Sequence, residues 1–170
     1  MNLKKLIALL LAVLMVIGVT ACGKGNDQPE AKKDSVVIAI GSEPETLDPT
    51  QGWGHGNSPI VQSTLVRYKS DLTFANDLAT GYELSPDGLV WTFKIRDDAK
   101  FTDGEKVTAE DVAFTLETAK ADKGSVDLTY MKSAVAKDDT TVEITLSTPT
   151  SIFLNTLASV GIVPKNAYGD

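Results

Sequence analysis

The segment from Tyr82 to Phe114 constrains the fold most, because it joins two turns, a strand pattern and a helix start with few residues between them. Residues 85–88 read Ser-Pro-Asp-Gly, which predicts a tight turn, since proline fixes φ and glycine accepts positive φ. A strand with one apolar face should follow, because large apolar residues recur at alternate positions: Leu89, Trp91, Phe93 and Ile95. Residues 102–105, Thr-Asp-Gly-Glu, predict a second turn.

A helix is predicted to begin after Thr108. Thr108 can cap it, and Asp111 stands three residues later as the partner in a capping box. Val112, Leu116 and Ala119 would then share one face of this helix.

Shorter signals predict further elements on both sides of this segment. Upstream, the apolar run 36–40 predicts a strand covered on both faces, and Ser58-Pro59 predicts a helix start. Residues 71–78 predict a turn and a short strand. Downstream, residues 130–136 and 141–146 predict a hairpin, and Ser151 can cap a short helix that carries Phe153, Leu154 and Leu157.

The N-terminus has the features of a targeting segment. Lys4 and Lys5 precede an apolar stretch, residues 6–19, that is too short and too quickly followed by polar residues for a conventional membrane span. Residues 19–22, Val-Thr-Ala-Cys, resemble a bacterial lipobox. We therefore expect residues 1–21 to be a lipoprotein signal peptide, with cleavage before Cys22 and lipid attachment to its thiol. Residues 22–34 are small and polar and predict a flexible tether.

The composition excludes some partners and some kinds of site, but it does not identify a function. The chain has 170 residues and a formal net charge of -7, which argues against nucleic acid or an anionic membrane surface as a partner. Cys22 is its single cysteine and His55 its single histidine, so no internal disulfide and no zinc site of Cys and His ligands can form. The adjacent acids at 97–98, 110–111 and 138–139 have structural explanations in strand, helix start and turn.

The loop 51–57, Gln-Gly-Trp-Gly-His-Gly-Asn, offers the clearest candidate binding residues. Its glycines, Gly54 among them, allow the backbone to approach a ligand closely. Trp53 presents a flat apolar face, Asn57 adds a polar side chain, and His55 is a donor, an acceptor or a metal ligand. From the residues alone, a mobile surface turn with one packed tryptophan explains the loop better than a binding role does, because most loop residues carry no function.

The residue pattern of the central segment resembles the signature of family 5 extracellular solute-binding proteins, the peptide- and nickel-binding receptors of ABC importers. The residues that carry the resemblance are Ser85, Asp87-Gly88, Trp91-Thr92-Phe93, Arg96-Asp97-Asp98, Lys100-Phe101, Asp103-Gly104, Thr108-Ala109 and Asp111-Val112. The resemblance implies an α/β fold of mixed α+β type, the N-terminal part of a two-lobed type II periplasmic-binding-protein fold, with a mixed sheet and packed helices. Full-length members enclose the ligand between two lobes, so residues 35–170 are expected to form the N-terminal portion of the domain, with the second lobe missing.

The resemblance also implies a binding site and partners. It places the loop with Trp53, Gly54, His55 and Asn57 at the ligand cleft, and Tyr130 is the candidate aromatic contact beyond it. No arginine follows Arg96, which removes the residue expected to hold an anionic nickel chelate. The implied partners are a peptide or small-molecule ligand, an ABC permease and ATPase, and the membrane through Cys22, with no cofactor.

Three functions follow from these observations. The leading one is an extracytoplasmic, lipid-anchored substrate-binding protein that captures peptides or nickel complexes and makes or breaks no bond. The alternative is a surface lipoprotein or interaction module derived from a truncated binding lobe, without a transport role. A lipid-anchored hydrolase would need a nucleophile paired with His55, which the sequence does not identify.

Overall fold

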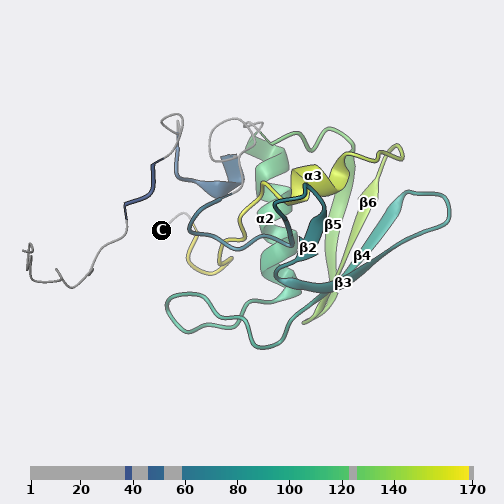
Figure 1. The fold of residues 1–170 in the computed structure, drawn as a ribbon. Coiled ribbons are helices and arrows are strands. Elements are labelled where there is room, and N and C mark those ends of the chain that lie inside the picture. Colours follow the sequence, from purple (N-terminus) through teal and green to yellow (C-terminus); the bar gives the residue numbers. More distant parts are fainter. Residues whose placement is uncertain (1–36, 40–45, 52–58, 123–125, 169–170) are drawn as a thin grey trace, which may run out of the picture. The chain divides into compact units, whose positions relative to one another are not determined.

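The computed structural model describes residues 37–39, 46–51, 59–122 and 126–168 (Figure 1). The chain divides into two units at Gly41, and all the described helices and strands lie in the unit Ser42–Asp170. Within this unit, a four-stranded antiparallel sheet has the order β3-β4-β6-β5. Its strands are β3 (Ala79–Leu84), β4 (Val90–Ile95), β5 (Met131–Asp138) and β6 (Thr141–Leu146).

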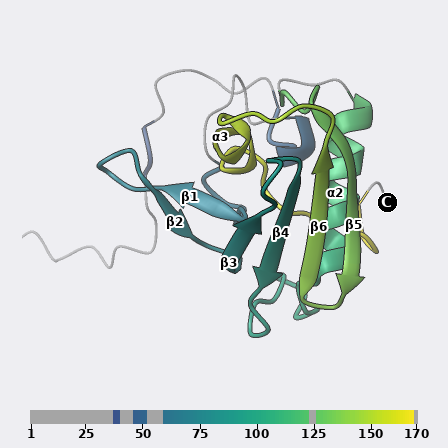
Figure 2. The same cartoon turned by 90° about the vertical axis from the view of Figure 1, so that its right-hand side faces the viewer.

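Helix α2 (Ala109–Asp122) packs on the sheet against β5 and β6, as the two ribbon views show (Figures 1 and 2). The short helix α3 (Phe153–Leu157) follows the sheet in sequence, and the 3-10 turn η2 (Pro49–Gln51) packs against α2. A separate two-stranded hairpin joins β1 (Val66–Tyr68) to β2 (Phe74–Asn76).

The predicted apolar face of β4 is confirmed and forms the centre of the core. Trp91, Phe93 and Ile95 are buried, whereas Lys94 between them is exposed. In the neighbouring strand β6, Val142 lies opposite Phe93 and is fully buried as well. The alternation of buried and exposed side chains in β4 is therefore matched by that in β6. The buried side chains of both strands form one apolar cluster with those of α2.

The two predicted turns and the predicted helix start are also confirmed. Gly88 and Gly104 have φ values of 72° and 94°, a region that glycine occupies without steric penalty. At the start of α2, the Asp111 carboxylate accepts hydrogen bonds from the Thr108 backbone N–H (2.9 Å) and hydroxyl (2.8 Å). The Asp111 N–H donates back to the Thr108 hydroxyl at 3.4 Å, so each residue satisfies groups of the other.

The turn between β1 and β2 contains a backbone conformation that the sequence did not predict. Leu72 has φ 64°, and no other non-glycine residue in the described part of the chain has a positive φ. Its N–H donates to the Lys69 carbonyl at 2.9 Å, and its side chain is 78% exposed. The left-handed region crowds the Cβ of an L-residue, so this turn holds a strained leucine that contacts little.

We expect Leu72→Gly to raise the free energy of unfolding by about 0.5–1 kcal/mol, since relief of left-handed strain exceeds the entropy that glycine adds to the unfolded chain. Urea unfolding of the two proteins measures this difference. Ser70→Gly is the matched control in the same turn, because Ser70 has no positive φ and should gain nothing. Equal effects of the two substitutions would contradict strain at Leu72.

Two predicted elements and one predicted helix cap are wrong. Residues 37–39 of the predicted strand 36–40 lie outside any strand, and Val37 is 93% exposed. An apolar run becomes a buried strand only beside pairing partners, and none of the described strands pairs with it. Residues 36 and 40 themselves lie outside the described residues.

The helix predicted from Ser58-Pro59 is wrong for its described part, because residues 59–65 are not helical. Their backbone groups bond instead to a distant segment: the Leu78 N–H donates to the Thr64 carbonyl at 3.0 Å. The Asp77 and Ala79 N–H groups both donate to the Leu65 carbonyl, at 3.2 and 3.1 Å. These long-range bonds override the local signal of Pro59.

The short helix α3 is confirmed, but its predicted cap is not. Ile152 occupies the N-cap position with no side-chain hydrogen bond, so Ser151 does not cap this helix. Buried Phe153 and Leu157 hold α3 to the core, which makes a polar cap unnecessary for so short an element.

The α/β fold class is confirmed. The predicted mixed sheet is not found among the described residues, because every described strand pair is antiparallel. Across the described residues, no helix is long and apolar enough to cross a membrane.

Candidate ligand-binding site

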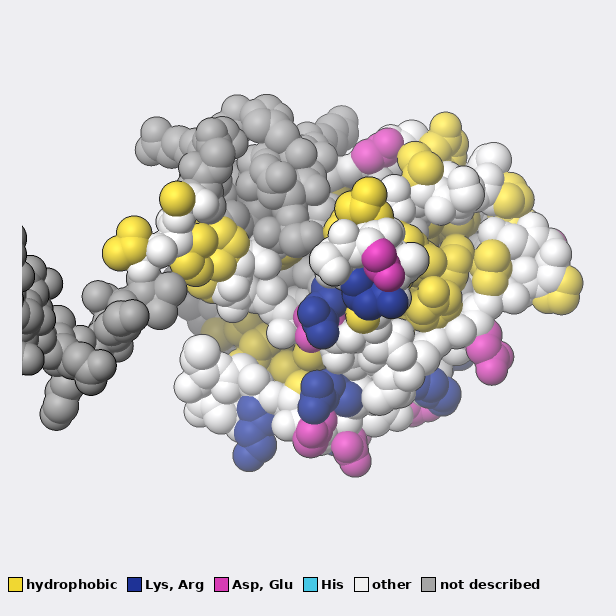
Figure 3. Space-filling model, in the orientation of Figure 1, with side chains coloured by type: hydrophobic (Ala, Val, Ile, Leu, Met, Phe, Trp, Pro, Cys, Tyr) yellow, Lys and Arg dark blue, Asp and Glu magenta, His cyan; other side chains and the backbone are white. Residues whose placement is uncertain are grey.

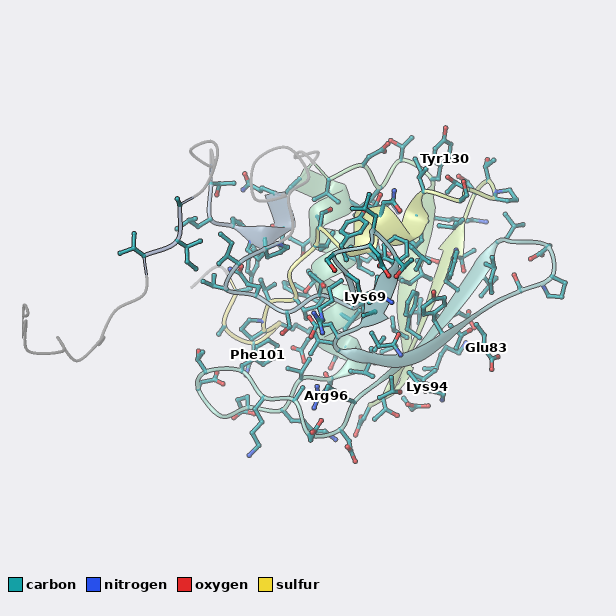
Figure 4. All side chains as sticks on the ribbon, viewed as in Figure 1. Lys69, Glu83, Lys94, Arg96, Phe101 and Tyr130 are labelled. Carbon is teal, nitrogen blue, oxygen red and sulfur yellow. The ribbon has the colours of Figure 1, made fainter. Side chains whose placement is uncertain are left out.

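Most of the residues predicted to bind ligand, Trp53, Gly54, His55 and Asn57, lie outside the described residues, as does Cys22. Tyr130 is described: it lies in the turn before β5 and is 43% exposed (Figure 4). Its carbonyl accepts hydrogen bonds from the Ser147 N–H (2.8 Å) and hydroxyl (3.1 Å), which fixes its backbone beside the end of β6. Two described stems flank the loop 52–58: the upstream stem ends at Gln51, and the downstream stem begins at Pro59.

The upstream stem is fixed by a hydrogen-bond cluster around Asp48. One Asp48 carboxylate oxygen accepts from the Thr50 N–H (2.9 Å) and hydroxyl (2.8 Å). The other accepts from the Tyr168 hydroxyl at 2.7 Å, and Tyr168 also lies 2.8 Å from the Thr50 hydroxyl. Since Tyr168 packs edge-on against Phe114 of α2, the cluster joins both ends of the described unit to the same helix.

Hydrogen bonding sets the charge state of this cluster. Partial burial acts to raise the Asp48 pKa, but hydrogen bonds from Tyr168, Thr50 and Gln51 together outweigh it and hold the pKa below its ordinary value. Burial, together with the nearby Asp48 carboxylate, raises the pKa of the Tyr168 phenol. Asp48 is therefore an anion and Tyr168 a neutral donor at neutral pH.

The Asp48 cluster predicts a loss of stability in acid. Because the folded-state pKa is depressed, its contribution is present above the unfolded pKa of about 3.9 and is lost as pH falls through the folded pKa. Tyr168→Phe removes one donor, so it should lower the free energy of unfolding by about 1–2 kcal/mol at pH 7 and by less at pH 3. Urea titrations at both pH values measure this, with Tyr130→Phe as the control; a pH-independent loss would contradict the mechanism.

The downstream stem meets the upstream stem at Gly161. A Cβ at Gly161 would lie 2.6 Å from the Gln62 Cβ, 2.8 Å from the Pro49 Cβ and 3.2 Å from the Pro59 Cγ. The Ile162 N–H also donates to the Ser63 carbonyl at 2.9 Å. Residues on both sides of the loop therefore contact the backbone at Gly161 so closely that only glycine fits there.

A cavity of about 460 Å³ lies beside the downstream stem. Its floor is apolar and buried, and it includes Leu78, Val107 and Ile162. Charged residues line the same cavity, two basic and two acidic: Arg96, Lys100, Asp77 and Asp103. An apolar floor with charges of both signs suits a small zwitterionic or amphipathic molecule.

An ion pair orients Arg96, one of the two basic side chains that line this cavity. Arg96 donates to both carboxylate oxygens of Asp98, at 2.6 and 2.8 Å. Asp98 raises the pKa of Arg96, and the same hydrogen bond lowers the pKa of Asp98. Figure 4 shows Arg96 and Phe101 on the same side of the molecule, and Figure 3 shows acidic side chains beside basic ones on this face.

The described residues contain no cluster of three or more His, Cys, Asp or Glu side chains that could hold a metal ion. The described acidic pairs have structural partners: Asp111 caps α2 and accepts from the Lys165 N–H at 2.9 Å, and Asp138 accepts from the Thr140 N–H at 2.9 Å.

Sequence reasoning missed the Asp48 cluster, the contact at Gly161 and the charged cavity. One signal was available for the second, because Gly161 interrupts the apolar run 160–163, and such a glycine often marks close backbone approach. The Asp48–Tyr168 contact gave no local signal, since 120 residues separate its members.

Comparison with known proteins places this geometry in a family. Residues 73–170 match the bacterial extracellular solute-binding proteins, family 5 Middle. The probable D,D-dipeptide-binding periplasmic protein DdpA of Escherichia coli K12 is 36% identical over 139 residues, which cover 76% of this chain and 27% of DdpA. Protein XP55 of Streptomyces lividans is 36% identical over 168 residues, covering 93% of this chain and 30% of XP55.

Among solved structures, NikZ from Campylobacter jejuni in complex with Ni(L-His) is similar, with a TM-score of 0.71 and 33% identity. The similarity covers 80% of this chain and 28% of NikZ. The chain thus spans less than a third of the length of these relatives: 27% of DdpA, 30% of XP55 and 28% of NikZ. With more than half of its residues inside the matched region, the chain belongs to the bacterial extracellular solute-binding proteins of family 5.

Proposed function

We propose that this chain is the N-terminal part of a substrate-binding lipoprotein of an ABC importer, which captures peptides or nickel complexes outside the cytoplasm. Family membership is the observation that carries the proposal. The substrate classes are suggested by the D,D-dipeptide that names DdpA and by the Ni(L-His) bound to NikZ.

The mechanism we propose is capture, enclosure and delivery, without any bond being made or broken. The ligand is held on this lobe and is enclosed by a second lobe supplied by the polypeptide that full-length relatives contain beyond the matched region. The closed form then docks on the membrane permease, and the ATPase drives release. Lobe closure around a ligand is a common form of conformational change in binding proteins.

The proposed ligand contacts are the loop residues Trp53, Gly54, His55 and Asn57, together with Tyr130. The two stems support this assignment, because the Asp48 cluster and the close packing at Gly161 fix the loop's points of attachment. A loop held at both ends loses less entropy when it binds a ligand than one with free ends.

The membrane attachment we propose is a lipid on Cys22, with residues 22–34 as the tether. Expression of the whole chain in a bacterial host with labelled palmitate should label the protein and place it in the membrane fraction. Cys22→Ser should abolish the label. Labelling of that variant would overturn the lipid anchor and leave the proposed ligand binding untouched.

Ligand class can be found by a thermal-shift screen of the whole chain with dipeptides, longer peptides, Ni(II), and Ni(II) with histidine. A ligand that binds the folded state raises the melting temperature by mass action, by an amount that grows with ligand concentration. A shift with one class identifies the substrate. A cooperative melt that no class shifts contradicts ligand capture by this lobe and favours the interaction-module alternative.

If the ligand is a nickel complex, His55→Ala should weaken binding at least tenfold by titration calorimetry, since imidazole is the only strong nitrogen donor side chain in the sequence. Lys132→Ala, an exposed substitution on β5, is the control and should leave the affinity unchanged. Unchanged affinity in His55→Ala would exclude nickel ligation by this residue.

A further inference from the structure

The β1–β2 hairpin projects from the described unit, away from the four-stranded sheet (Figure 2). Its two strands are only three residues long each, and the turn between them spans residues 69–73. We call residues 67–73 the hairpin tip. The turn is closed by hydrogen bonds from the Lys69 N–H to the Thr73 carbonyl (2.8 Å) and from the Leu72 N–H to the Lys69 carbonyl (2.9 Å). It is therefore an ordered projection.

Leu72 lies in the hairpin tip with a backbone conformation and a side-chain exposure that are both unfavourable for leucine. Its φ of 64° is strained for any residue with a Cβ, and its side chain is 78% exposed. The Leu72 backbone N–H bonds within the turn, but its side chain is not buried against the described residues. Strain that the fold does not use points to a role outside it.

The side chains near Leu72 form two groups, one aromatic and one cationic. Tyr68 and Phe74 lie opposite each other in the ladder, with ring centroids 5.1 Å apart, and Tyr68 remains 37% exposed. Arg67 and Lys69 flank Tyr68 in sequence and are both exposed. Arg67 lies in β1, where alternation along the strand points it to the face opposite Tyr68. Figure 4 shows Lys69 on the side of the molecule that faces the viewer.

The single acidic residue of the hairpin tip, Asp71, interacts with other residues of the same turn. The Asp71 carboxylate accepts from the Thr73 N–H (3.0 Å) and hydroxyl (2.6 Å), and it lies 3.7 Å from the Lys69 ammonium. Arg67 has no acidic partner among the described residues, so the hairpin carries a local excess of positive charge.

We propose that the hairpin tip is a membrane-contacting element that rests on an anionic bilayer surface. An exposed leucine, an amphipathic tyrosine and two long cationic side chains are the chemistry of the membrane interface, where apolar groups enter the headgroup region and cations meet lipid phosphates. Leu72 would enter deepest, Tyr68 would lie at headgroup level, and Arg67 and Lys69 would meet the phosphates.

The acidic sequence as a whole does not prevent this contact. Its formal net charge of -7 is spread over the chain, and charges farther away than a Debye length of about 8 Å are screened at physiological salt. Local charge at the hairpin therefore decides which part of the molecule faces an anionic surface. Such a contact would orient a lobe that is already held at the membrane, so it goes beyond ligand capture and depends on no ligand.

A fluorophore at the hairpin tip tests the proposal. Cys22→Ser removes the native thiol, and Ser70→Cys then carries an environment-sensitive label in the full chain. Vesicles of equal phosphatidylcholine and phosphatidylglycerol should shift its emission to the blue, and vesicles of phosphatidylcholine alone should shift it less than half as much. Any other lipid-binding part of the chain acts equally in every variant, so the label reports the hairpin itself.

Two substitutions and one control position decide the outcome. Leu72→Gly, which we expect to be a more stable protein, should at least halve the shift, and Lys69→Glu should remove its dependence on anionic lipid. The same label at Lys137→Cys on β5 should not respond. No shift at Ser70→Cys, or an equal shift at Lys137→Cys or in Leu72→Gly, would overturn the proposal. Because neither ligand nor transporter is present, such a failure leaves the proposed transport function untested and separate.

Discussion

Replacing Phe93 by alanine is expected to lower the free energy of unfolding by about 3–5 kcal/mol, the range for deletion of a buried aromatic ring. Phe93 is fully buried at the centre of the sheet and lies opposite Tyr82 on one side and Val142 on the other. Its ring centroid is 5.3 Å from that of Tyr82 and 6.1 Å from that of Trp91. Alanine would leave a ring-sized void that β4 cannot close, because β4 is paired with a neighbouring strand on both sides of Phe93.

Urea unfolding followed by circular dichroism measures this loss. Val135→Ala is a useful control, since Val135 lies on β5 of the same sheet but is 49% exposed, and its truncation should cost less than about 1 kcal/mol. A domain has only about 5–15 kcal/mol of stability, so Phe93→Ala should also broaden or abolish the cooperative transition. A loss no larger than that of Val135→Ala would mean that the core does not centre on β4.

The parts of the fold that sequence predicted are those fixed by neighbours in the chain. Alternation of Trp91, Phe93 and Ile95 specifies a strand because the side-chain period of a strand is two, whatever the strand pairs with. The α2 start depends on Thr108 and Asp111, only three residues apart. Glycines at 88 and 104 are required by φ values that the turns impose locally.

The parts that sequence did not predict depend on distant partners. Pro59 is a sound local signal for a helix start, yet the backbone from Thr64 onwards pairs with residues 77–79. The run 36–40 is apolar enough for a strand, but a strand also needs a neighbour. In the candidate site the same limit applies, because Asp48 meets Tyr168, and Gly161 meets Pro49, only after the whole unit has folded.

Gly161→Ala is the second substitution with a large expected effect, and it acts on the candidate site itself. The added Cβ would be built 2.6 Å from the Gln62 Cβ and 2.8 Å from the Pro49 Cβ, distances that atoms in folded proteins do not adopt. Neither neighbour is the free end of a flexible side chain, so the stems before and after the loop 52–58 must move apart. Overpacking of this kind typically costs about 1–3 kcal/mol.

Gly81→Ala supplies the matched control, because a Cβ at Gly81 has nothing within 4 Å. Both substitutions restrict the unfolded chain equally, which by itself stabilises a protein by about 0.4–1 kcal/mol. Gly81→Ala should therefore be neutral or slightly stabilising, and the difference between the two variants isolates the contact at Gly161. Urea unfolding measures that difference, and equal stabilities would show that the stems yield freely.

The same pair of variants connects the fold to the proposed function. If the loop binds ligand, displacement of its stems should weaken the affinity for whichever ligand the thermal-shift screen identifies, whereas Gly81→Ala should leave that affinity unchanged. Titration calorimetry well below both melting temperatures separates this effect from unfolding. A Gly161→Ala protein that is less stable but binds with full affinity would place the ligand elsewhere, with the charged cavity of Arg96 and Lys100 as the next site to test.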